Sequence, residues 1–202
     1  MKYPVLNKYK ITQGFGRTPF SKKSGDEIYY FFGGKHPGLD FAMPAGEPVF
    51  AALPGYVTSV EYHRGMGKTI RIRYGNLQHI YGHLSKFEVD FGNWVKEGQK
   101  IGLSGNSISW GKPHLHFELR DSTVYEVKDR PIKPDFDSDL PKEFKTKWTY
   151  IANHGEAIID LAIKFFGSEM GLKILKGTNP NLKRLASHYM LPIGSRINIP
   201  LK

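Results

Sequence analysis

Histidine and aspartate residues that could bind a metal are spread over three short segments of this 202-residue sequence. His36 and Asp40 are four residues apart, His83 stands alone, and His114 and His116 flank a single leucine. The chain has no cysteine, so a metal site would have to use His, Asp or Glu. Two imidazoles and one carboxylate suit a catalytic zinc, which commonly takes three protein ligands and keeps a fourth position for water.

His36, Asp40 and His116 could supply these three ligands. Zinc lowers the pKa of its water to about 7 and polarises a carbonyl, so it supports hydrolysis at neutral pH. His83 and His114 would then be available for general acid and base catalysis or for stabilising an oxyanion. Alternation along a strand places His114 and His116 on one face, about 6.5–7 Å apart, and Glu118 on the same face.

Each of these motifs is a weak signal by itself, because a single histidine is usually a surface residue or a packed core residue. The other four histidines are interpreted in that way, and they are His63, His79, His154 and His188. The combination of the three segments is what favours a metal site.

Short β segments separated by Gly and Pro must position these residues between about residues 9 and 134. Typical segments are residues 48–52, 56–62, 69–74, 77–84 and 114–120. The segment 69–74 alternates apolar and basic side chains, as a half-buried strand does. Many short strands at this spacing predict an antiparallel sheet or sandwich.

A different periodicity begins after a polar, proline-containing stretch. Residues 156–166 have a helical apolar stripe, residues 170–175 suggest a second helix, and strands are expected at 148–151 and 196–200. The sequence therefore predicts a mainly β domain over residues 1–135, a linker over 136–146, and a small α+β domain of order strand–helix–helix–strand over 147–202.

The first of these domains resembles the lysostaphin-type, or LytM-like, zinc metallo-endopeptidases. That family has a His-x-Gly-x-Asp motif, a later histidine and a His-x-His motif, which match residues 36–40, His83 and residues 114–116. The surrounding segments also fit, at residues 11–17, 40–49, 52–57, 95–102 and 111–118. The resemblance covers roughly residues 9–135, and as a set it is highly specific.

The resemblance implies one zinc ion bound by His36, Asp40 and His116, with His83 and His114 as catalytic histidines. It further implies an endopeptidase that cuts peptide cross-links of bacterial peptidoglycan. One departure is the stretch 18–35, which is longer than the family's usual link and is expected to form a wall of the cleft.

The C-terminal segment 150–200 resembles LysM-type modules, and is similar to the variant found in phage tail proteins. Such modules usually bind glycans rich in N-acetylglucosamine, although in phage tails they can serve as assembly contacts. A small packing domain without a ligand is the alternative for this segment.

The chain carries a net charge of +10, and residues 141–202 hold 10 Lys and Arg against 4 Asp and Glu. Basic charge alone would permit nucleic-acid binding, but no nucleic-acid motif supports it. No signal peptide or membrane span is visible, and this favours a phage virion, or an extracellular or cell-wall location reached by another route. The main alternative to the enzyme is a non-catalytic phage tail or assembly protein that reuses the peptidase fold.

Overall fold

The computed structural model describes residues 1–6, 9–75, 77–108, 111–121, 130–137, 147–152, 156–166 and 171–200. Its strands are β1 (Ile11–Gln13), β2 (Leu39–Ala42), β3 (Pro48–Phe50), β4 (Gly55–His63), β5 (Gly67–Tyr74), β6 (Leu77–Leu84), β7 (Lys86–Phe87), β8 (Trp94–Val95), β9 (Lys100–Leu103), β10 (His114–Asp121), β11 (Arg130–Ile132), β12 (Lys147–Ile151) and β13 (Arg196–Pro200). Its helices are α1 (Pro19–Ile28), α2 (Ile158–Phe166) and α3 (Gly171–Thr178), with short 3-10 turns η1 (Tyr30–Phe32) and η3 (Pro180–Leu182).

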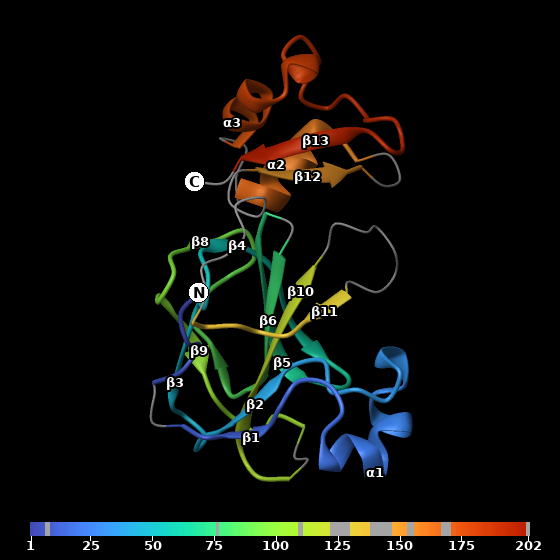
Figure 1. The fold of residues 1–202 in the computed structure, drawn as a ribbon. Helices are drawn as coiled ribbons and strands as arrows, with labels where there is room; N and C mark the ends of the chain where they lie inside the picture. Colours follow the sequence, from blue (N-terminus) through green and yellow to red (C-terminus); the bar gives the residue numbers. More distant parts are fainter. Residues whose placement is uncertain are drawn as a thin grey trace.

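An antiparallel sheet of order β1-β2-β10-β6-β5-β4-β8 forms the main layer, and β11 pairs with β10 at its side (Figure 1). The mainly β, antiparallel character predicted for this region is confirmed. The central strands β6 and β10 pair with a register that places Phe117 opposite Tyr81 and His116 opposite Gly82. The candidate site residues therefore come from the middle of the sheet and from β2 beside it.

A second sheet of order β3-β9-β7 covers one face of the main sheet. Val49 of β3 and Ile101 of β9 join Ile70, Tyr81 and Phe117 of the main sheet in one apolar cluster. All five side chains are buried. Burial of this face leaves the opposite face of β10 free to carry polar side chains.

The insertion 18–35 contains a helix, α1, that the sequence analysis did not predict. Thr18 precedes it, and its Oγ1 accepts a hydrogen bond from the Ser21 backbone N–H at 3.1 Å. Ser21 Oγ in turn accepts one from the Thr18 N–H at 2.8 Å, and Pro19 occupies the first helical position. A Thr cap followed by Pro is a helix start signal, although the segments that flank it in the sequence have β character.

The C-terminal part contains strand β12, helices α2 and α3, and strand β13, in that order along the chain. β12 and β13 pair antiparallel as a separate two-stranded sheet. Figure 1 shows these elements together at one end of the molecule, next to β4 and β8. Asp160 Oδ2 accepts a hydrogen bond from the Ala157 N–H at 3.0 Å and so caps the start of α2.

Most of the predicted linker 136–146 lies outside the described residues, as does His154. Phe136, its first residue, stacks on Tyr3 with ring centroids 4.3 Å apart and also lies against Phe41 and Phe117. Packing of the β domain therefore extends at least to Phe136. Within the described part of the chain, no helix is both long and apolar enough to cross a membrane.

Candidate metal centre

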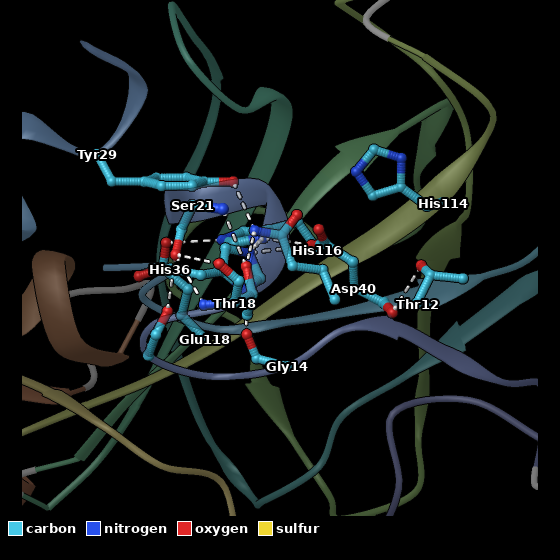
Figure 2. Close-up of polar contacts among 12 residues, drawn as sticks. Thr12, Gly14, Thr18, Ser21, Tyr29, His36, Asp40, His114, His116 and Glu118 are labelled. Atoms are coloured by element: carbon cyan, nitrogen blue, oxygen red, sulfur yellow. Dashed lines mark hydrogen bonds and ion pairs between the residues drawn. The ribbon is translucent and has the colours of Figure 1, made fainter. Parts of the chain in front are cut away.

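Three side chains from two segments, residues 36–40 and β10, meet on the polar face of the main sheet (Figure 2). His116 Nδ1 lies 2.7 Å from Asp40 Oδ1 and 3.2 Å from His36 Nε2, and His36 Nε2 lies 3.4 Å from Asp40 Oδ1. Each of the three residues is buried. The predicted ligand triad is thus brought together in space.

Backbone pairing explains why these residues converge. Asp40 on β2 is the register partner of His116 on β10. His36 precedes β2 and exchanges two backbone hydrogen bonds with Gly16, each 2.9 Å long. Gly38 lies between His36 and Asp40 in the sequence, and a Cβ atom there would come within 2.3 Å of the Phe117 carbonyl oxygen. The glycine of the His-x-Gly-x-Asp motif is required because β10 passes so close.

Both histidine rings are held from behind by hydrogen bonds on their other nitrogen. His36 Nδ1 donates to the Gly14 carbonyl oxygen at 2.8 Å, which leaves Nε2 directed at the other two residues. His116 Nε2 donates to Glu118 Oε1 at 2.8 Å, which leaves Nδ1 directed at them. Histidine ligands of metals are oriented by partners of this kind.

The electrostatics of the cluster attract positive charge. Burial would raise the pKa of Asp40, but hydrogen bonds from His116 and His36 outweigh it and hold that pKa well below its usual range. Burial would lower the pKa of His116, but Asp40 and Glu118 raise it to about 10. Asp40 is therefore an ionised carboxylate, and a cation bound between the groups would replace the proton that His116 otherwise retains.

The donor set fits a divalent metal. Atoms bound to zinc at 2.0–2.1 Å in tetrahedral geometry lie about 3.3 Å from one another. The three separations of 2.7, 3.2 and 3.4 Å come close to this value, so the groups need only small movements to surround an ion. Among the described residues, this trio is the cluster of His, Asp and Glu that could hold a metal.

His83 lies beside the cluster although strand alternation would point it the other way. Tyr81 faces the core, so a residue two positions later on a regular strand would also face the core. His83 instead has φ +62°, and its ring centroid lies 4.5 Å from that of His114 and 5.8 Å from that of His116. The register shift between Lys68 and Ile70 marks a β-bulge at this point.

The two predicted catalytic histidines differ in their surroundings. His83 is buried, and burial followed by the charges of His116 and His114 lowers its pKa to about 3. Its ring is therefore neutral near pH 7, and its Nδ1 has no hydrogen-bond partner in the part of the chain described. His114 is half-buried, and its Nδ1 donates to the Lys112 carbonyl oxygen at 2.8 Å. Figure 2 shows His114 to one side of the triad.

Two further residues at the site had no role in the sequence analysis. Glu118 was placed on the face of His116, but only the structure shows its contact with that ring. Tyr29 comes from the insertion, and its ring centroid lies 5.3 Å from that of His36. Burial and the charge of Asp40 raise the pKa of Tyr29 to about 12, so the hydroxyl stays protonated. No spacing rule connects Tyr29 to the triad.

Comparison with known proteins gives a family match over the same region. The family described as peptidase family M23 matches residues 34–134, which is half of the chain. The chain is 38% identical over 135 residues to peptidoglycan DD-endopeptidase ShyA of Vibrio cholerae, covering 65% of this chain and 28% of that protein. It spans less than a third of the length of curated relatives such as this one.

Solved structures give the same result. A zinc-containing peptidase from Vibrio cholerae is 34% identical, with a TM-score of 0.54 over 69% of this chain and 40% of that one. The catalytic domain of lysostaphin from Staphylococcus simulans is 34% identical, with a TM-score of 0.50 over 58% of this chain and 84% of that one. Neither likeness covers the whole of this chain.

Proposed function

Because the chain belongs to peptidase family M23, we propose that it is a zinc-dependent endopeptidase that hydrolyses peptide bonds in bacterial peptidoglycan. The observation that carries this proposal is the convergence of His36 Nε2, Asp40 Oδ1 and His116 Nδ1 within reach of one ion. The DD-endopeptidase ShyA, to which the chain is similar, supports the substrate class. The zinc-containing relative supports the choice of metal.

In this proposal His36, Asp40 and His116 hold one zinc ion. When bound, zinc acts as a Lewis acid on the scissile carbonyl and makes water acidic enough to lose a proton near pH 7. The buried triad fixes where the carbonyl must lie, because its donor atoms are held by the partners behind them.

In the proposed reaction, His114 and His83 have different catalytic roles. With Nδ1 donating to the Lys112 carbonyl, Nε2 is the nitrogen of His114 that remains to accept a proton, which suits a general base for water. His83 can donate a hydrogen bond to the oxygen that gains negative charge as the carbonyl is attacked. The proton taken from water then passes to the nitrogen of the leaving amine as the C–N bond breaks.

The test is loss of turbidity of purified cell walls, measured with and without a chelator. We expect lysis to stop when the metal is removed and to return when zinc is added. His116→Ala should abolish both lysis and zinc retention, whereas His188→Ala, at an exposed position in the C-terminal part, should change neither. Unchanged lysis by the His116→Ala protein would refute the proposed metal role.

For the C-terminal part, we propose that residues 147–202 form a LysM-like module, joined to the peptidase domain by a linker at 136–146. Its strand, helix, helix and strand support that assignment. We propose that it binds cell-wall glycan and, in a phage or prophage context, that it contacts other tail proteins. Titration of the whole protein with N-acetylglucosamine oligomers tests glycan binding, and mass spectrometry of purified particles tests tail association.

A further inference from the structure

Strand β10 carries a row of polar side chains that continues beyond the proposed catalytic residues. The residues that alternate with this row face the core, and they are Leu115, Phe117 and Leu119. After His114 and His116, the polar face continues with Glu118 and Arg120. In the proposal above Glu118 only holds the His116 ring, and Arg120 has no part in it.

Glu118 determines which nitrogen of His116 is available to a metal. It is buried, and its Oε1 lies 2.8 Å from His116 Nε2. A carboxylate can only accept a hydrogen bond, so this contact keeps the proton on Nε2. The lone pair of the neutral ring is then on Nδ1, the atom that faces Asp40 and His36.

Arg120 holds Glu118 in that position. Arg120 Nε donates a hydrogen bond to Glu118 Oε2, so both carboxylate oxygens are used and neither can rotate without losing a partner. The side chain of Arg120 is only 13% exposed. A buried carboxylate would be costly without this cation beside it.

Phe32 extends these contacts into the insertion. The Arg120 guanidinium lies over the Phe32 ring, 5.2 Å from its centroid, and Phe32 belongs to η1 of the 18–35 segment. Such stacking limits where an arginine can lie. The insertion also supplies Tyr29 beside His36, so it lies against the surroundings of both histidine ligands.

We propose that Glu118, held in place by Arg120 and Phe32, is a positioning residue that keeps His116 Nδ1 available to the metal, so that the 18–35 insertion sets the metal affinity. This inference rests on the proposed metal site. It adds to that proposal a role for the 18–35 insertion that does not require contact with substrate.

The experiment measures zinc affinity by competition with a chromophoric chelator, in the full chain and without any substrate. We expect Glu118→Ala to weaken zinc binding by roughly 10- to 100-fold, as loss of an orienting partner typically does. Glu118→Gln keeps an acceptor oxygen for Nε2–H and should restore part of that loss. Arg120→Met and Phe32→Leu should weaken binding in the same direction by progressively smaller factors.

Two matched controls separate this effect from general damage. Arg71→Met removes an arginine that also pairs with a carboxylate on the sheet, that of Glu61. Phe31→Leu changes the exposed neighbour of Phe32 in the same turn. Both variants should bind zinc like the unmodified protein.

Nuclear magnetic resonance supplies a second readout that a merely structural role would not change. In the zinc-loaded protein, the His116 Nε2–H proton should give a downfield signal because it is bonded to a carboxylate. The signal should move upfield in Glu118→Gln and broaden in Glu118→Ala, and it should shift slightly in Phe32→Leu.

The outcomes are distinguishable. If the unmodified protein binds no zinc, the proposed function itself fails. If it binds zinc but Arg120→Met and Phe32→Leu bind equally well, the positioning role is overturned. Glu118→Ala could fail to fold because it leaves Arg120 without its partner, and circular dichroism would reveal this. Arg120→Met and Phe32→Leu then decide the question.

Discussion

Both histidine donor atoms of the candidate metal site are oriented by a second contact behind the ring. His36 is held through the Gly14 carbonyl and His116 through Glu118, while the backbone carbonyl of Asp40 accepts a 3.3 Å hydrogen bond from Thr12 Oγ1. The two rings therefore do not have to search for their binding geometry. Such preorganisation is what lets a site bind a metal tightly and place a substrate carbonyl accurately.

Separate substitution of the two proposed catalytic histidines should uncouple metal binding from turnover. Neither His83 nor His114 belongs to the trio that could hold the ion. We expect His83→Ala and His114→Ala each to retain one zinc per chain and to lower kcat by roughly 10²- to 10⁴-fold. Metal analysis beside a cell-wall turbidity assay checks this. Loss of zinc from the His114→Ala protein would contradict the division of roles.

His79 should make stability depend on pH. It is fully buried, its Nδ1 accepts a hydrogen bond from the Tyr81 hydroxyl at 2.7 Å, and burial lowers its pKa to about 3. In the unfolded chain its pKa is about 6.5, so below that pH the unfolded state binds a proton that the folded state does not. The free energy of unfolding should therefore fall as the pH falls from about 6.5 towards 3.

Urea denaturation between pH 6.5 and 5 measures this contribution as a difference between proteins, since Asp40 and Glu118 stay ionised there and His83, whose pKa is also lowered to about 3, is present in both. The slope of unfolding free energy against pH should be steeper in the unmodified protein than in His79→Asn, by at most about 1.4 kcal/mol per pH unit. Equal slopes in the unmodified and His79→Asn proteins would show that His79 is protonated in the folded state.

At the scale of elements, the bulge in β6 decides which face of the sheet His83 occupies. Gly82 and His83 together stand opposite Thr69, because Lys68 pairs with Leu84 and Ile70 pairs with Tyr81. The His83 N–H donates to the Met66 carbonyl at 2.7 Å, which ties the left-handed residue to the β4–β5 turn. Bulges next to active sites commonly redirect a side chain in this way.

Gly105→Ala should displace His83 without changing the His83 side chain itself. A Cβ atom at Gly105 would lie 2.6 Å from the Ser85 nitrogen and 2.9 Å from the His83 carbonyl oxygen, so the end of β6 would have to shift. We expect kcat to fall by about 10- to 100-fold while zinc remains bound. Gly177→Ala is the control, because nothing lies within 4 Å of a Cβ atom there. Equal kcat values for the two variants would show that the site tolerates this shift.

At the scale of the whole molecule, the C-terminal part packs directly on the main sheet. Tyr56 of β4 belongs to the same buried cluster as Ile158 and Leu161 of α2, and Trp94 of β8 packs against that cluster. The Tyr56 and Trp94 rings meet edge to face with centroids 4.6 Å apart. A shared core of this kind couples the stability of two parts of a chain.

Leu161→Ala should therefore destabilise the whole chain and not only its C-terminal part. Removing a fully buried leucine side chain costs roughly 2–5 kcal/mol. We expect the unfolding curves followed by tryptophan fluorescence and by zinc release to shift together to lower denaturant concentration. A variant in which zinc release keeps its original midpoint would show that the two parts unfold independently.

The amino-acid sequence was sufficient to predict a metal site and the class of fold. His36, Asp40 and His116 were predicted as ligands from the combination of three short motifs and from their resemblance to a known family, because a metal site needs particular donors. The β segments were recognised from their period of two. The order of elements in the C-terminal part followed from a change in hydrophobic period. These are local properties, which a linear pattern records.

The support and the orientation of these residues depend on contacts that form only in the folded chain. Simple alternation would have turned His83 into the core, and the bulge that reverses it depends on a partner strand. The contact of Phe32 with Arg120 and the packing of α2 on β4 join residues far apart in sequence. No spacing in the chain encodes them, because each depends on which surfaces meet once the sheet has formed.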